Sequence, residues 1–366
     1  WKTIHITEDG MYSLSPAFLA QMGFENPDNV HLYGYGGHQQ SHLLNADNDF
    51  DDLEEVPLYR APNGNLLFWG NGLVHWNGTE RVFNAYANRA TYFLTSGEPR
   101  KDIGTAAAYT GTTNQTITTK LGHALHEVDN YAWFRAGRNL VESTTFAGEK
   151  TKTYTLNGIN SLGNERLTVV FTASEVSTPL KIWANGIEVA QKSISEPGSY
   201  MYYSEAKYPN MDVSQMNPGT DTWSITLATQ GPFATSSRVL ARLDYMAMNF
   251  TAPLHLRNGY VHFGGGISGT GPGTGSSSTV TSKYSGATRF SNVGSNAGND
   301  IKIMRIGRRG KPACLMPAQQ GNTGMTFTTA DGTEEFVAFN PNHAFPEPAI
   351  GQNIGNQDLH AINGVD

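Results

Sequence analysis

The chain has 366 residues, of which 38% are hydrophobic and only 16% are charged, against about 25% charged residues in an average globular domain. This composition excludes a disordered chain, which would be rich in charge and poor in aromatic residues, and it argues against a helical bundle. A net charge of −7 without a basic stripe excludes a typical nucleic-acid-binding protein, because neutralising phosphates supplies most of that affinity. No window approaches the roughly 18 consecutive apolar residues of a membrane-spanning helix, so no membrane span is expected.

The first elements are predicted to be strands around one short helix. Lys2–Thr7 alternates apolar and polar residues, and Glu8–Gly10 predicts a hairpin turn into a second strand at Met11–Leu14. Ser15–Pro16 suits the N-cap and first position of a helix that Gly23 would end. Further strands are predicted at Val30–Tyr33, Glu55–Tyr59, Leu66–Trp69 and Thr91–Thr95.

From about residue 161 the pattern is typical of a β-sandwich. Asn185–Gly186 separates two alternating runs and is the strongest short-range hairpin signal, because both residues tolerate the positive φ of a type I′ turn. The Gly-rich segment 264–278 is predicted to be a flexible loop that proteases cleave before other internal segments. Strands are predicted at Arg166–Ala173, Leu180–Ala184, Ile187–Gln191, Thr222–Thr229, Val239–Asn249, Thr288–Phe290, Ile301–Ile306, Ala313–Met316, Met325–Thr328 and Glu335–Phe339.

These signals together predict a mainly β, multidomain chain. We expect an N-terminal β-rich domain over residues 1–158 and a β-sandwich region, jelly-roll-like, over 159–340 that carries the Gly-rich loop and a further β segment. Residues 341–366 are rich in Pro, Asn and Gly and are predicted to form an extended tail outside the core.

The candidate reactive residues do not form a recognisable catalytic motif. The single cysteine, Cys314, excludes an internal disulfide and a Cys-rich zinc site. It lies in an apolar run without an adjacent His, so we expect a buried structural thiol and not a nucleophile. His123 and His126 would share one face of a helix, but their spacing differs from the H-E-x-x-H zinc motif, and a surface pair is expected.

Two further groups of residues are candidates for binding sites and not for catalysis. Asp47–Asp52 groups the oxygen ligands that calcium prefers, but it lacks the Gly and Glu of an EF-hand loop; a solvated acidic turn is expected, and calcium is left open. Trp69, Trp76 and Trp133 are candidates for a sugar-stacking platform, although most aromatic residues of a β protein lie in its core. The residues therefore assign no catalytic, cofactor-binding or metal-ligating position.

Short motifs in a fixed order carry a resemblance to a known family. The stretches are Trp1–Leu14 (WKTIHITEDGMYSL), Val30–Gly37 (VHLYGYGG), Asp51–Tyr59, Leu66–Gly72, Tyr92–Thr95, Gly137–Arg138, Leu243–Leu254, Phe336–Asn340 and Ile350–Ala361. Their co-linear order resembles the N-terminal region of the PorU-like family of gingipain-type cysteine peptidases, the sortases of type IX secretion. Gly351, Asn356, Gln357, Leu359 and His360 match a signature that the family carries just before its catalytic domain.

The resemblance implies a non-catalytic role for this chain. The caspase-like α/β peptidase domain, with its catalytic His and Cys, would follow residue 366, so the parent would be a cysteine-type endopeptidase. The chain would then position or regulate that downstream domain and contact outer-membrane secretion partners, in a protein secreted to the surface of a Gram-negative bacterium. The competing interpretation is a stand-alone extracellular binding module for glycans or proteins, because a β-sandwich does not by itself define a function.

Overall fold

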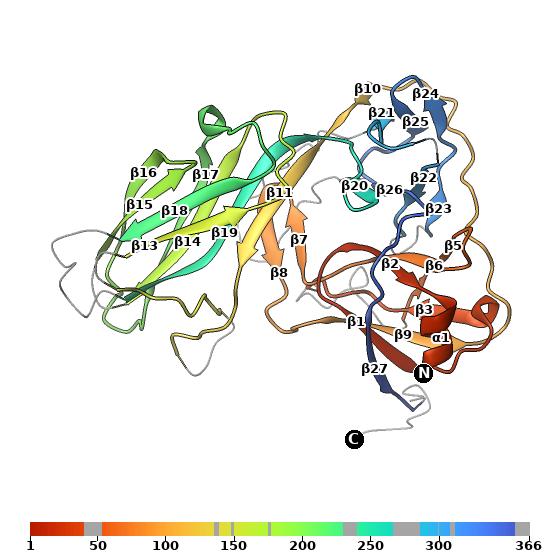
Figure 1. Cartoon of the computed structure of the whole chain (residues 1–366), viewed down its shortest axis with the longest axis horizontal. Coiled ribbons are helices and arrows are strands. Elements are labelled where there is room, and N and C mark those ends of the chain that lie inside the picture. Colours follow the sequence, from red (N-terminus) through yellow and green to blue (C-terminus); the bar gives the residue numbers. More distant parts are fainter. Residues whose placement is uncertain are drawn as a thin grey trace. The chain divides into compact units, whose positions relative to one another are not determined.

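The computed structural model describes residues 1–39, 53–134, 139–147, 150–174, 177–229, 240–265, 286–298, 300–307 and 312–355 (Figure 1). The described chain is almost entirely β, as predicted, and it forms two compact units. Unit 1 comprises Trp1–Thr118 and Leu254–Asp366, and unit 2 comprises Thr119–Pro253. No helix among the described residues is long and apolar enough to cross a bilayer.

Unit 1 is built from short strands and one helix. Its elements before unit 2 are β1 (Lys2–Ile6), β2 (Gly10–Leu14), α1 (Pro16–Gln21), the 3₁₀ turn η1 (Pro27–Asn29), β3 (Val30–Tyr33), β4 (Glu55–Val56), β5 (Tyr59–Arg60), β6 (Leu66–Gly70), β7 (Val74–Asn77), β8 (Glu80–Phe83), β9 (Ala90–Ser96) and β10 (Gln115–Ile117). Those after it are β20 (Tyr260–Gly264), β21 (Thr288–Val293), β22 (Lys302–Arg305), β23 (Cys314–Leu315), β24 (Gln319–Gly321), β25 (Gly324–Thr329), β26 (Glu335–Phe339) and β27 (Ala349–Asn353).

The strands of unit 1 form several small sheets. The largest has the order β27-β1-β9-β3-β4, and the others have the orders β2-β6-β5, β20-β26-β22-β23, β10-β21-β25-β24 and β7-β8. α1 begins as predicted, with the Ser15 hydroxyl accepting a hydrogen bond from the Phe18 amide at 3.1 Å and Pro16 at the first position. Phe18 and Leu19 on this helix are buried in one core with Ile4 and Leu32.

The predicted hairpin at Glu8–Gly10 is wrong. β1 pairs with β9 and β27, whereas β2 pairs with β6, so the turn carries the chain from one sheet to another. The Asp9 carboxylate in this turn accepts a hydrogen bond from the Gly72 amide at 2.6 Å, which fixes the turn to a neighbouring loop.

The predicted tail is corrected in its middle part. Ala349–Asn353 forms β27, which pairs antiparallel with β1 through Ile4 and Ile350. This five-residue segment has Ile350 as its only large apolar residue and shows no hydrophobic alternation, so the sequence alone does not mark it as a strand. Residues 356–366 and most of the Gly-rich segment 264–278 lie outside the described residues, as does Asp47–Asp52.

Unit 2 is a β-sandwich, as predicted. Its elements are β11 (Thr119–Glu127), β12 (Phe146–Ala147), β13 (Thr151–Leu156), β14 (Arg166–Ser174), β15 (Thr178–Ala184), β16 (Ile187–Ile194), β17 (Ser204–Asp212), the 3₁₀ turn η3 (Ser214–Met216), β18 (Trp223–Thr229) and β19 (Leu240–Pro253). One sheet has the order β11-β19-β14-β17 with β12 beside β19, and the other has the order β13-β18-β15-β16. Val169 and Phe171 of the first sheet share a core with Ile182 and Trp223 of the second.

The unit boundaries differ from the predicted domain boundaries at residues 158 and 340. Residue 158 falls between β13 and β14, inside the sandwich. The chain enters unit 2 at Thr119 and leaves it at Pro253, and these two residues are paired across β11 and β19. Unit 2 is therefore an insertion in unit 1, an arrangement that depends on pairing between strands far apart in the sequence.

The Asn185–Gly186 turn is confirmed and leads to a stability prediction. Their φ values are 50° and 81°, and they join β15 to β16 as a two-residue loop. A Cβ on Gly186 would meet nothing within 4 Å, so replacing Gly186 with Val changes only the backbone preference. We expect Gly186→Val to lower the free energy of unfolding by about 1–3 kcal/mol.

The measurement is chemical denaturation of both the parent and the variant. Gly198→Val is the control, because Gly198 lies in the same unit, has open space around it and has no positive φ. Equal stabilities of the two variants would contradict the strain at the Gly186 turn.

Candidate functional site

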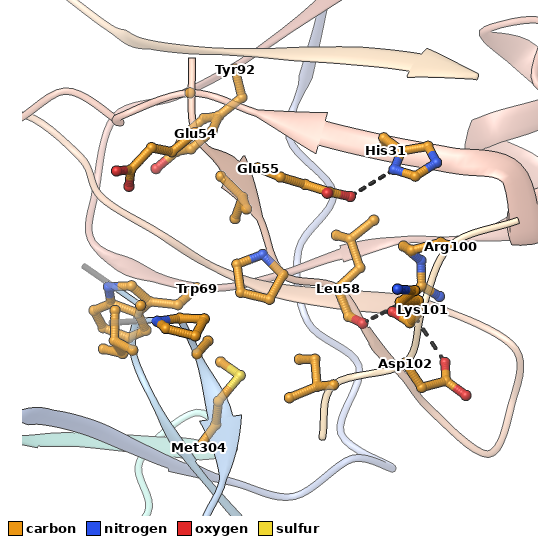
Figure 2. A pocket seen from close by; sticks show the side chains of 18 of the residues that line it. His31, Glu54, Glu55, Leu58, Trp69, Tyr92, Arg100, Lys101, Asp102 and Met304 are labelled. Atoms are coloured by element: carbon orange, nitrogen blue, oxygen red, sulfur yellow. Dashed lines mark hydrogen bonds and ion pairs between the residues drawn. The ribbon is translucent and has the colours of Figure 1, made fainter. Parts of the chain in front are cut away.

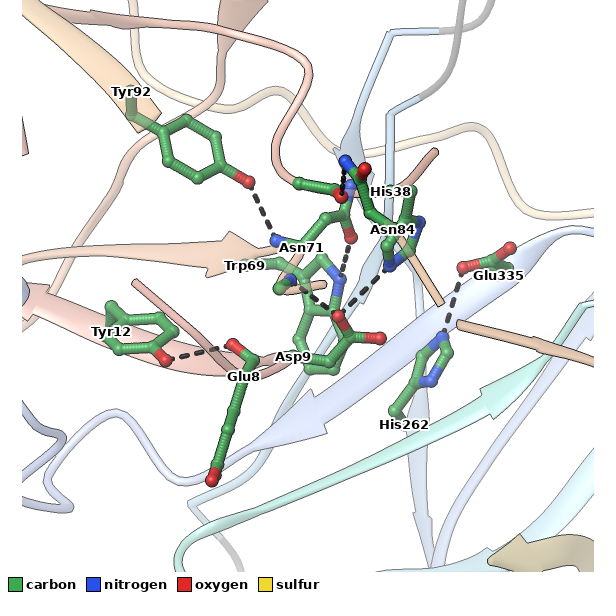
Figure 3. Close-up of polar contacts among 12 residues, drawn as sticks. Glu8, Asp9, Tyr12, His38, Trp69, Asn71, Asn84, Tyr92, His262 and Glu335 are labelled. Atoms are coloured by element: carbon green, nitrogen blue, oxygen red, sulfur yellow. Dashed lines mark hydrogen bonds and ion pairs between the residues drawn. The ribbon is translucent and has the colours of Figure 1, made fainter. Parts of the chain in front are cut away.

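A polar cluster in unit 1 brings together residues from both of its chain segments (Figure 3). His38 Nε2 lies 3.1 Å from the Asp9 carboxylate, and the rings of His38 and His75 are 4.7 Å apart. His262 on β20 lies 3.2 Å from the Glu335 carboxylate on β26. We call these five residues the histidine cluster.

Trp69 and its neighbours connect the histidine cluster to the core. The Trp69 ring lies 4.7 Å from the His262 ring, and its indole N–H donates to the Asn71 side chain at 2.8 Å. The backbone N–H of Asn71 donates to the Tyr92 hydroxyl at 2.7 Å. Trp69 is buried with Met304 and Phe339, so its predicted core role is confirmed.

Charges within the histidine cluster influence one another. Burial raises the pKa of Glu335, but the hydrogen bond from His262 and the charges of the three histidines outweigh it and lower the pKa. Burial and the adjacent His38 lower the pKa of His75. The arrangement pairs each carboxylate with an imidazole of its own chain segment, and the charges of His38 and His75 act on Glu335 of the other segment.

A cavity of about 790 Å³ lies beside this cluster in unit 1 (Figure 2). Leu58, Trp69 and Met304 give it an apolar wall, and His31 and Arg100 give it a polar one. The Arg100 guanidinium donates to the Leu58 carbonyl at 2.9 Å, so this cation is already engaged with the backbone. The cavity therefore has mixed character and no converging set of reactive groups.

His31 on β3 is the titratable group of this cavity with the clearest partners. Its Nδ1 lies 2.6 Å from the Glu55 carboxylate, and its Nε2 lies 2.9 Å from the Glu98 carbonyl. Burial lowers the pKa of His31, but these two acceptors outweigh it, and the net effect is a raised pKa.

This contact predicts how a single substitution changes a titration. Glu55→Gln should lower the pKa of His31, because the variant keeps a hydrogen-bond acceptor but removes the negative charge. NMR titration of the His31 ring protons measures this change in pKa. Glu54→Gln is the matched control, since the carboxylate of Glu54 points away from His31 in Figure 2; equal His31 titrations in the two variants would contradict the assignment.

Unit 2 contains a cluster of three carboxylates. One oxygen from each of Glu127, Asp129 and Asp244 lies within 4.8 Å of the others, and Asp244 is buried. Carboxylate oxygens are the ligand type that calcium takes. Each of these residues also has other polar or electrostatic partners, so their proximity does not by itself define a metal site. The sequence reasoning missed this cluster because β19 supplies Asp244 from more than 100 residues away.

The predicted helical histidine pair is corrected. His123 and His126 lie on strand β11, where residues three apart point to opposite faces. His123 contacts the Asn249 side chain at 2.7 Å, and His126 lies 3.4 Å from the Glu142 carboxylate. They are thus separate structural contacts and do not form one site.

Glu142 is a buried acid that holds several partners in unit 2. It accepts hydrogen bonds from Lys152 and from the Tyr154 hydroxyl, the latter at 3.1 Å. Burial raises the pKa of Glu142, but the hydrogen bonds from Lys152 and Thr144, with the Lys152 charge, outweigh it and lower the pKa. Sequence reasoning missed Glu142 because a single Glu in a loop carries no distinctive pattern.

The lowered pKa predicts a pH-dependent stability effect. Ionised Glu142 stabilises the fold above its ordinary pKa of 4.5, and this contribution is lost as the pH falls through the lower folded-state pKa. Glu142→Gln should therefore cost about 1–3 kcal/mol near neutral pH, and the difference should shrink in acid. Urea denaturation between about pH 3 and pH 7 measures this difference in the free energy of unfolding. Glu188→Gln, on the surface of β16, is the control. A difference that does not change with pH would refute the assignment to Glu142.

Cys314 lies at the edge of a sheet, on the short strand β23 beside β22, and it is half-buried and not fully buried as expected. Burial raises the pKa of its thiol, and Glu334 adds to that effect while Arg305 opposes it. A reactive cysteine needs a lowered pKa. The environment of Cys314 therefore does not activate its thiol as a nucleophile.

A solved structure matches this β architecture over nearly the whole chain. No family model matches the chain, and no curated protein matches it in sequence. Among solved structures, dimeric latent PorU from Porphyromonas gingivalis matches with a TM-score of 0.70 and 20% identity, covering 98% of this chain. The chain therefore has the PorU-like fold that its sequence motifs predicted. It spans about a third (33%) of the length of that PorU chain.

Shorter matches lie among carbohydrate-binding modules. A family 35 module from Clostridium thermocellum has a TM-score of 0.22 at 13% identity, covering 36% of this chain and 90% of the module. The CBM36-1 domain of a xylanase from the hindgut metagenome of Trinervitermes trinervoides has a TM-score of 0.23 at 16% identity, covering 35% and 95% respectively. These scores are too low to define a shared fold.

Proposed function

We propose that this chain is the non-catalytic β region of a secreted, gingipain-type cysteine peptidase of the PorU kind. The observation that carries the proposal is the fold match to PorU over 98% of this chain, which leaves about two thirds of the PorU chain outside the match. A catalytic domain fits in that remainder. In this role the chain positions or regulates the downstream peptidase domain.

The chemistry of the described residues supports a non-catalytic role. The single cysteine has a raised pKa, and the histidine cluster pairs its imidazoles with Asp9 and Glu335 and not with a thiol. His360, within the family-like signature, lies outside the described residues. On this proposal the catalytic His and Cys belong to the downstream domain.

Location, sortase activity and secretion partners follow from the same proposal. A PorU-like parent would be secreted or held at the outer-membrane surface of a Gram-negative bacterium, and it would contact outer-membrane secretion proteins. The alternative is a stand-alone binding module. The coding sequence after Asp366 distinguishes them, since a stop codon there favours the module and an α/β domain with a His and Cys favours the peptidase.

The direct test is a peptidase assay on this chain, its Cys314→Ala variant and a longer protein that includes the downstream region. Substrates are Arg- and Lys-containing peptides and a broad peptide library. We expect no turnover by the chain or by the variant, and turnover once the downstream region is attached. Turnover by the chain that is lost in Cys314→Ala would overturn the non-catalytic assignment, and an inactive longer protein would favour the binding module.

A further inference from the structure

Unit 2 exposes a run of large apolar side chains in the loop between β16 and β17. Tyr200 is 100% exposed, and Met201 and Tyr202 are 65% and 63% exposed. Large apolar side chains stabilise a fold by leaving water. Three consecutive ones in solvent contribute little to folding, and such exposed patches commonly mark binding surfaces.

Neighbouring aromatic rings hold this loop in a defined orientation. The Tyr202 ring stacks on the Phe134 ring at 4.4 Å with an interplanar angle of 18°, and the Tyr203 ring stacks on Trp133 at 6.0 Å with an angle of 20°. We call Phe134, Tyr200, Met201, Tyr202 and Tyr203 the aromatic platform.

Trp133 anchors the platform to the sandwich. Its indole N–H donates to the Thr172 hydroxyl on β14 at 2.9 Å, and the buried Arg242 guanidinium on β19 lies 5.2 Å from its ring. The base of the platform is thus fixed by a hydrogen bond and a cation–π contact. A surface whose rings are already oriented loses less entropy when it binds a ligand.

Polar side chains with long, weak hydrogen bonds border the rings. The Asn139 amide lies 3.4 Å from both the Tyr203 hydroxyl and the Glu205 carboxylate, distances at which hydrogen bonds are weak. An amide, a phenol and a carboxylate therefore sit beside flat apolar faces. This combination complements a sugar ring, which has an apolar C–H face and hydroxyls at its edge.

The size and charge of the platform argue against other ligands. A stable protein interface takes about 20–30 residues per side, many more than the platform offers. Glu196 and Glu205 lie in or beside this loop, and Lys192 and Lys207 flank it, so its charges balance and it is not the cluster of basic residues that binds an anionic lipid surface. The same carboxylates disfavour an anionic saccharide.

We propose that the aromatic platform of unit 2 binds a neutral saccharide chain, with Tyr200 and Tyr202 stacking on its rings and Asn139 and Glu205 bonding to its hydroxyls. This site does not depend on a peptidase domain, and it assigns a ligand class to a surface that the proposed function leaves unused.

The test is isothermal titration calorimetry of the whole chain with defined oligosaccharides. The neutral probes are cellohexaose, maltohexaose, xylohexaose, mannohexaose and laminarihexaose, and the anionic probes are oligogalacturonate and oligoalginate. We expect micromolar to millimolar binding of at least one neutral probe and weaker binding of the anionic ones. Tyr202→Ala and Tyr200→Ala should each weaken it by about tenfold or more, as loss of one stacking contact would.

Matched controls separate binding from folding. Tyr86 in unit 1 is 63% exposed, the same as Tyr202, so Tyr86→Ala removes an equally exposed tyrosine outside the platform and should leave binding unchanged. Tyr202→Phe keeps the ring and should retain most of the affinity, and thermal melting verifies that each variant is folded. The proposal fails if no neutral probe binds, if anionic probes bind more tightly, or if the platform variants bind like the parent.

Discussion

Pairing between the two ends of the chain is the constraint on which unit 1 depends. β1 lies between β9 and β27 in its sheet, so the first strand obtains one neighbour only from residues 349–353. The core has the same dependence, because Met11 and Trp69 are buried together with Val337 and Phe339. Contacts this distant in sequence require closure of a long loop before they stabilise anything. Unit 1 therefore cannot complete its core until the segment after unit 2 has returned.

The same constraint explains how unit 2 is inserted. Thr119 and Pro253 pair across β11 and β19, so the two connections to unit 1 are adjacent strands. Closing the sandwich brings these connections together, which reduces the entropic cost of returning the chain to unit 1. In unit 1, the Tyr260 hydroxyl of the returning segment donates to the Asp9 carbonyl, and the His262 ring packs against the Trp69 ring.

Local features were predictable from the sequence, and distant ones were not. The Ser15 cap and the Asn185–Gly186 turn each depend on neighbouring residues, and both are confirmed. The turn at Glu8–Gly10 looked like a hairpin because two strands flank it, but its strands have better partners elsewhere. The three carboxylates of unit 2 show why such a cluster could not be predicted from the sequence, because Asp244 meets Glu127 only after β19 has paired with β11.

The sandwich also shows where function can reside on such a scaffold. β19 is buried over most of its length. One face packs in the core of the sandwich, and on the other the Arg242 guanidinium lies 3.5 Å from the ring of Tyr131. Substitutions on these buried strands would cost stability. Loops can change without that cost, and three of the most exposed large apolar side chains among the described residues of unit 2, Tyr200, Met201 and Tyr202, lie in the loop between β16 and β17.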